Sequence, residues 1–149
     1  MIRPIAVRAA QRPVACLLAL LGLVGVCGCD SGPELGQVTG RVTLHGKPLD
    51  QIQVQFIPDP STNVAGQMAW AVTQQNGVYE MEYSDSRGVK GVAVGLNRVT
   101  LQDLAPENTR QGRPPDSRVP RPYASPFQSP ITFQVEPGEQ VFDIELSEL

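Results

Sequence analysis

The sequence predicts an all-β fold in which seven short strands form a sandwich of two sheets. After residue 36, apolar residues alternate with polar ones at a period of two, the pattern of half-buried strands. Turn residues separate the alternating runs. The 14 Gly and 14 Pro among 149 residues disfavour a helical bundle. Two sheets are expected because each has an apolar face that must be covered.

The first two strands are expected within residues 37–45 and 51–56. In the first, apolar and small residues alternate with threonine, arginine and histidine; in the second, three glutamines alternate with apolar residues. A Gly-Lys-Pro turn at 46–48 separates the two runs, and the prolines of 58–60 end the second.

The third and fourth strands are expected at residues 68–73 and 79–83, joined by a tight turn at Asn76-Gly77, because this pair tolerates positive φ. Trp70 and Tyr79 occupy positions that we expect to face the core. In the third strand, Met68, Trp70 and Val72 form the apolar file, with Ala69, Ala71 and Thr73 opposite. The alternatives for this strand are that both of its faces are covered or that it lies centrally in its sheet.

Three further strands are expected at residues 97–101, 131–135 and 142–146, where apolar and polar residues again alternate. The segment 104–122 holds five prolines and four arginines, so it forms neither a central strand nor a helix. A loop of this length inside a compact domain is either mobile or functional, and we expect it to be mobile.

Residues 1–28 have the layout of a lipoprotein signal peptide. Three arginines precede an apolar run of 15 residues, from 14 to 28, and no acidic residue occurs before Asp30. A helix needs about 20 apolar residues to cross a bilayer, so a permanent transmembrane span is the weaker interpretation. The domain is therefore expected to be exported.

The end of this run, Val26-Cys27-Gly28-Cys29, resembles a bacterial lipobox, which ends in a lipid-bearing cysteine. Cys29 is the expected acceptor, because the small Gly28 precedes it, whereas the larger Val26 precedes Cys27. A thiolate can form the thioether to the lipid, and several acyl chains, such as palmitate, hold a protein firmly at a membrane. The alternative is a simple cleaved signal with an incidental thiol. The choice between inner and outer membrane stays open.

The rest of the chain divides into a tether, residues 29–36, and the β-sandwich domain, residues 37–149. Removing residues 1–28 removes three of the 12 basic residues and none of the 15 acidic ones, so the formal net charge goes from −3 to −6. This charge disfavours nucleic-acid binding. All three cysteines lie at or before position 29, which excludes cysteine-based zinc sites from the domain. We expect no metal and no cofactor.

The sequence does not present a catalytic set. His45 is the only histidine, and we expect it to be exposed at the end of a strand. No Gly-rich phosphate loop, paired-carboxylate pattern or nucleophile elbow accompanies it. We therefore predict that the protein is not an enzyme, with an envelope hydrolase built on His45 as a remote alternative.

Candidate contact residues lie in and just after the proline-rich segment. The aromatic residues are expected mainly to fill the core; as surface candidates, Tyr123, and with it Tyr83, could present an aromatic face to a sugar ring. Arg118 and Arg121 belong to the one basic concentration of the domain and could meet a partner, an acidic lipid or an anionic wall polymer. The plainer alternative is that these arginines keep the loop soluble.

The order and spacing of several segments resemble the carboxypeptidase regulatory-like domains of planctomycete-type lipoproteins. The opening Gly36-Gln37-Val38-Thr39-Gly40-Arg41-Val42-Thr43-Leu44 is followed by turn and strand segments similar to those of the family, at 46–49, 54–58, 76–81, 91–101 and 122–133. The resemblance covers residues 36–146. It implies a transthyretin-like, seven-stranded Greek-key sandwich that is generally not catalytic. Asn97 stands where the family has a tyrosine.

These observations together predict an exported, lipid-anchored, non-catalytic β-sandwich that acts as an interaction or structural module at the cell envelope. It would be held to the membrane through Cys29, facing the periplasm or the exterior. Its partner would be an envelope protein or a glycan, which the sequence does not identify. The alternative from another class is a carbohydrate or small-ligand binding module.

Overall fold

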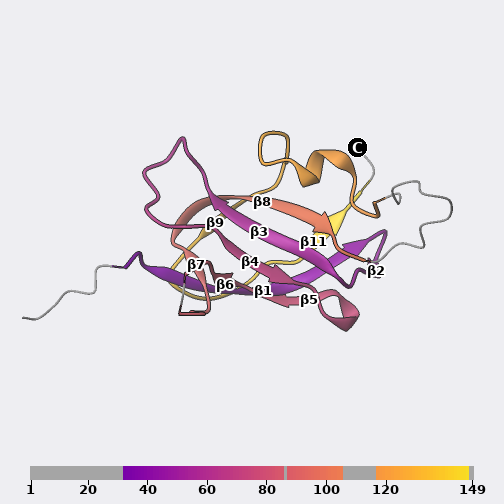
Figure 1. Ribbon diagram of the computed structural model, residues 1–149, viewed down its shortest axis with the longest axis horizontal. Coiled ribbons are helices and arrows are strands. Elements are labelled where there is room, and N and C mark those ends of the chain that lie inside the picture. Colours follow the sequence, from indigo (N-terminus) through magenta and orange to yellow (C-terminus); the bar gives the residue numbers. More distant parts are fainter. Residues whose placement is uncertain (1–31, 86, 106–116, 148–149) are drawn as a thin grey trace, which may run out of the picture. The chain divides into compact units, whose positions relative to one another are not determined.

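The computed structural model describes residues 32–85, 87–105 and 117–147, which form two β-sheets packed face to face (Figure 1). The β-sandwich expected from the alternating pattern is confirmed. The expected signal peptide, Cys29 and most of the 104–122 segment lie outside the described residues.

The first sheet is arranged around β1, Leu35–Leu44. Val38, Gly40 and Val42 are buried, and the residues between them lie on the opposite face, as the period of two requires. On one edge β1 pairs antiparallel with β2 (Lys47–Pro48), β5 (Val78–Glu80) and β7 (Val92–Ala93). On the other edge it pairs parallel with β10 (Gly138–Val141) and β11 (Ile144–Leu146).

The second sheet is antiparallel throughout. Its strands, in spatial order, are β6 (Glu82–Tyr83), β4 (Ala69–Val72), β3 (Ile52–Pro58), β8 (Gly95–Asp103) and β9 (Thr132–Val135). After β6 the chain contributes β7 to the first sheet and then returns to the second sheet as β8, which pairs with β3. The order β8-β3-β4-β6 is that of a Greek key.

All seven expected strands are present, and the structure adds short pairings. The expected fourth strand is divided into β5 and β6, and β2, β7 and β10 are additional. Asn76 and Gly77 have the positive φ angles, 72° and 71°, expected of their turn, which forms the short 3-10 helix η1 (Gln75–Gly77). The turn closes locally, but the chain then joins the first sheet as β5, because its backbone finds partners along β1.

Apolar side chains from both sheets fill the space between them. Phe56 of β3 meets the rings of Phe133 and Phe142 edge-on, at centroid distances of 6.1 and 6.2 Å, and these two rings stack at 4.2 Å. The largest fully buried side chains are Tyr79, Phe56, Ile52, Met81, Leu101 and Leu146.

The expected orientation of β4 was wrong. Ala69 and Ala71 are buried, whereas Trp70 and Val72 each keep 37% of their surface exposed. Only one file of a strand can face the core. Large side chains such as Tyr79 already occupy the core, so β4 contributes its small residues there and turns its indole outward.

The parallel pairing along β1 is interrupted between β10 and β11. The Phe142 N–H donates to the Thr39 carbonyl at 2.8 Å, as in a regular ladder. The next ladder bond would join the Arg41 N–H to the Phe142 carbonyl. Instead, the Arg41 N–H donates to Asp143 Oδ1 at 2.9 Å, and the Phe142 carbonyl accepts a hydrogen bond from the Tyr79 hydroxyl. Side chains therefore complete the ladder at the break.

Gly40 makes this junction possible. A Cβ at position 40 would lie 2.0 Å from the Phe142 carbonyl oxygen and 2.9 Å from the Tyr79 hydroxyl. Tyr79 is directly opposite Gly40 in the pairing of β5 with β1, so its side chain reaches across the glycine to the far edge of β1. Any larger residue at position 40 would displace that carbonyl.

We expect Tyr79→Phe to lower the free energy of unfolding at pH 7 by about 1–2 kcal/mol, because the Phe142 carbonyl loses its partner. Burial raises the pKa of Tyr79 above its ordinary 10.0, and the charge of Asp143 acts in the same direction. Above pH 10 the unfolded chain releases this proton before the folded one, so wild-type stability falls and the difference from Tyr79→Phe shrinks. Urea unfolding at pH 7, 9 and 11 measures it. A difference that stays constant up to pH 11 contradicts this account.

Candidate functional site

The second sheet presents an outer face that combines polar side chains with the tryptophan. Alternate residues of β3, β4 and β8 point away from the core. The register places Gln55 between Trp70 and Thr100, and Ile57 opposite Arg98. We call the following set the outer face: Gln53, Gln55, Ile57, Trp70, Val72, Arg98, Thr100 and Gln102.

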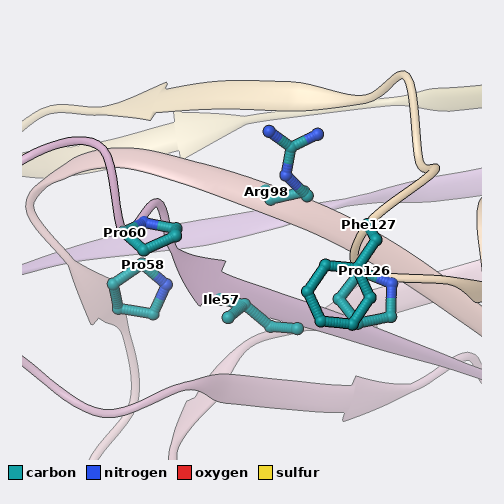
Figure 2. Close-up of a pocket in the computed structure, with 6 residues that line it drawn as sticks. All are labelled: Ile57, Pro58, Pro60, Arg98, Pro126 and Phe127. Atoms are coloured by element: carbon teal, nitrogen blue, oxygen red, sulfur yellow. The ribbon is translucent and has the colours of Figure 1, made fainter.

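A cleft of about 420 Å³ opens at one end of the outer face (Figure 2). Figure 2 shows Pro58 and Pro60 on one side and Pro126 and Phe127 on the other, with Ile57 between them. Arg98 is the remaining lining residue and brings the one charged group to the lining. The cleft thus offers mainly rigid apolar rings to a ligand.

A short hydrogen-bonded loop holds Phe127 at the cleft. The Ser129 N–H donates to the Ser125 carbonyl at 2.8 Å, and the Phe127 N–H donates to Ser125 Oγ at 3.3 Å. The buried Ser129 hydroxyl donates to the Val99 carbonyl, which ties the loop to β8. Phe127 is nevertheless 93% exposed. The loop therefore holds an exposed phenyl ring at the cleft.

The charge of Arg98 is neutralised by the carboxylate of Asp59. Its guanidinium donates to Asp59 Oδ2 at 3.1 Å and to the Ser129 carbonyl at 3.0 Å. The hydrogen bonds that Ser61 donates hold the pKa of Asp59 below its ordinary value, and Arg98 adds to this effect. Asp59 therefore stays ionised near neutral pH, and the cleft has little net positive charge.

The next row of the outer face is formed by Thr100, Gln55 and Trp70, of which Thr100 is itself covered, with 4% of its surface exposed. The Thr100 hydroxyl donates to Gln55 Oε1 at 3.3 Å, which orients the Gln55 amide. Glu82 lies on the other side of Trp70, directly opposite it in the pairing of β4 with β6. The indole is therefore flanked by an amide and a carboxylate.

The expectation that Tyr123 and Tyr83 lie on the surface was wrong. Tyr123, in the 3-10 helix η2 (Arg121–Ala124), is 5% exposed, and its hydroxyl donates to the Ser147 carbonyl at 3.4 Å. Tyr83 is 4% exposed, and its hydroxyl accepts a hydrogen bond from the Gln67 N–H. Both rings pack inward because η2 and β6 cover apolar parts of the sandwich, so neither presents a free face.

Arg118 and Arg121 have different surroundings. The Arg118 guanidinium donates to Asp103 Oδ1 at 2.6 Å, to Asp50 Oδ1 at 3.2 Å and to the Asp50 carbonyl at 2.8 Å. These bonds raise the pKa of Arg118, the one with Asp103 most of all. Arg121 is exposed at the start of η2. Arg118 therefore fastens its segment to the sheet, and the two arginines do not form one contact patch.

His45 is exposed at the end of β1, as expected, with a φ of 49°. In the described part of the chain, no three side chains of the metal-binding kind are grouped closely enough to hold an ion. The same residues contain no helix with the length and hydropathy needed to span a bilayer.

The sequence did not point to the cleft. Its lining comes from residues 57–60, Arg98 and residues 126–127, which are far apart in the chain and carry no shared motif. One sequence feature indicated that Trp70 could be exposed: both files of β4 consist of apolar or small residues, so the alternation alone does not show which file faces solvent.

We expect Arg118→Ala to lower the free energy of unfolding by about 2 kcal/mol, because Asp103 loses its partner while Arg118 itself is 31% exposed. Burial raises the pKa of Asp103, but the hydrogen bonds from Arg118 and Ala105 outweigh it, so the pKa lies below 3.8. This stabilisation is complete above pH 3.8 and is lost as the pH falls through the folded pKa.

Arg121→Ala is the matched control and should change stability by less than about 0.5 kcal/mol. Denaturant unfolding at pH 7 and pH 3 compares the two variants. Equal effects of Arg118→Ala and Arg121→Ala would show that the ion pair does not stabilise the fold.

No family model matches the chain, and no curated protein matches it. Among solved structures, the crystal structure at 1.80 Å resolution of a DUF3823 family protein from Parabacteroides merdae ATCC 43184 is similar to it, with 18% sequence identity and a TM-score of 0.42. The similarity covers 76% of this chain and 46% of that one, so this chain spans less than half the length of its structural neighbour. No statement about function follows from this likeness.

Proposed function

We propose that the protein is an exported, lipid-anchored, non-catalytic β-sandwich that serves as a binding module at the cell envelope, with the outer face and its cleft as the contact surface. The observation that carries this proposal is the display of Trp70 and Phe127 on one side of the second sheet, where Phe127 lines an apolar cleft and Trp70 lies outside its lining. Large apolar side chains that are exposed together mark interaction sites more often than apolar side chains that are exposed singly.

The other exposed apolar residues support this choice of face. Val78 and Val141, 41% and 74% exposed, lie on the first sheet, where Val141 is the one apolar residue of a groove that also has Glu80 and Glu139 in its lining. The outer face therefore offers the more apolar surface together with a shaped cavity.

The anchoring part of the proposal is supported by the sequence before the sandwich. The basic start, the short apolar run and Cys29 after Gly28 have the order of a lipoprotein signal, and the segment resemblance to carboxypeptidase regulatory-like domains of planctomycete-type lipoproteins agrees with it.

The non-catalytic part is supported by the surroundings of the single histidine. His45 lies at an exposed strand end, away from the cleft lining. A general base acts on a substrate held within hydrogen-bond reach, and a solvent-exposed turn does not provide such a site.

We expect Cys29→Ala to abolish incorporation of radiolabelled palmitate and signal cleavage when the full chain is expressed in a bacterial host, because the thioether can no longer form. Cys27→Ala is the matched control and should be labelled and processed like the wild type. Unchanged labelling of Cys29→Ala, or processing that globomycin does not inhibit, would rule out this anchor.

We expect the full chain, purified in a non-glycosidic detergent, to co-sediment with insoluble envelope material from the source cells. The double variant Trp70→Ala/Phe127→Ala should bind about tenfold more weakly, because it removes two exposed aromatic contacts. Val141→Ala on the first sheet is the control and should bind like the wild type. Equal binding by all three proteins would show that the outer face is not the contact surface.

A further inference from the structure

The exposed indole of Trp70 offers an aromatic ring on the outer face. Trp70 is the only tryptophan of the chain, and 37% of its surface is open on a sheet whose other side is fully covered by the core. Trp70 lies on a strand that is paired on both sides, with β3 and β6, and such a strand positions a side chain more precisely than a loop would. A sugar ring has one face of C–H groups, which packs on an indole and buries apolar area.

Hydrogen-bonding groups lie beside the indole on both neighbouring strands. Gln55 Oε1 accepts a bond from Thr100, and its Nε2 forms no bond with the described residues, so its two N–H donors are directed to solvent. Gln55 and Trp70 are cross-strand neighbours, with Cβ atoms about 5 Å apart. On the other side of Trp70, the exposed Glu82 offers acceptors. Sugar hydroxyls both accept and donate, and this pair of neighbours matches them.

The charge of the face favours a neutral ligand over an anionic one. Arg98 is paired with Asp59, and Glu82 adds a negative charge next to Trp70. Lys90 lies opposite Glu82, but its ammonium group is paired with Glu80. An anionic polymer or lipid headgroup would meet this carboxylate without a compensating cation from Arg98.

The cleft extends the site along β3. Ile57, at its centre, lies two residues from Gln55 on the same face, which corresponds to about 7 Å. The rings of Pro58, Pro126 and Phe127 present apolar edges and faces to a second sugar. A glycan that reaches both places needs more than one sugar ring.

We infer that the outer face binds a neutral glycan chain, with Trp70 stacking on one sugar ring, Gln55 and Glu82 hydrogen-bonding its hydroxyls, and the cleft receiving a further ring. This inference rests on the proposed function and names the ligand class of the same surface.

The single tryptophan makes the test direct. The full chain in a non-glycosidic detergent is titrated with neutral hexasaccharides of glucose in β-1,4 and β-1,3 linkage, of mannose, of xylose and of N-acetylglucosamine. Tryptophan fluorescence and isothermal titration calorimetry are recorded. At least one hexasaccharide should change the fluorescence of Trp70 and bind in the micromolar to millimolar range. A hexagalacturonate and a proline decapeptide serve as the anionic and peptide probes and should not bind.

Variants then assign the contacts by calorimetry. Trp70→Ala should weaken binding of that hexasaccharide about tenfold or more, and Trp70→Phe should restore it to within about threefold of wild type. Gln55→Leu should weaken it about threefold to tenfold. Val141→Ala is the control and should not change it. Urea unfolding of each variant checks that the fold is retained. We expect it to be, because these side chains lie outside the core.

The inference is overturned if no neutral hexasaccharide binds, if Trp70→Ala binds like the wild type, or if only hexagalacturonate or the peptide binds. If envelope co-sedimentation still depends on Trp70 and Phe127 in that case, the binding module stands and its ligand is not a neutral glycan. If co-sedimentation is also independent of these residues, the proposed function itself fails.

Discussion

The sandwich depends on how the backbone of β1 is paired on both of its edges. Backbone N–H and C=O groups inside a protein must find partners, and the break between β10 and β11 would leave two of them unpaired. The Asp143 carboxylate and the Tyr79 hydroxyl take their place, and only a glycine at position 40 leaves room for the Phe142 carbonyl between them. The same junction directs the Phe142 ring onto Phe133, so the first sheet is joined to the second through the aromatic core.

The outer face is a consequence of that core. Because Tyr79, Met81 and Phe56 fill the space between the sheets, β4 has room there for alanines only, and its large side chains are placed in solvent. A side chain that projects from a paired strand has little freedom, and the loop that carries Phe127 is tied to β8 through Ser129. The candidate surface is therefore largely formed before any ligand arrives, which reduces the entropy that binding must offset.

The arginines that the sequence groups together are used inside the fold. Arg118 joins Asp103 at the end of β8 to Asp50 just before β3, so it holds the segment that returns from the proline-rich region against the second sheet. Arg98, which the sequence did not single out, joins the Asp59 turn to the Ser129 carbonyl. Both guanidinium groups are paired with neighbouring carboxylates. With an excess of acidic residues over the whole chain, this leaves a surface better suited to uncharged ligands than to anionic ones.

The sequence alone determined the fold class, because a period of two and well-placed turn residues are local properties that any sheet protein must satisfy. It located every long strand and the positive φ angles at Asn76 and Gly77. The inward position predicted for Trp70 of β4 was wrong, since both files of this strand are compatible with burial and the choice depends on the volume left by Tyr79 and Phe56. Nor could the sequence show that Tyr123 is covered or that Arg98, Ile57 and Phe127 meet at one cleft. Those outcomes depend on contacts between residues distant in the chain, and only the packing of the two sheets brings them together.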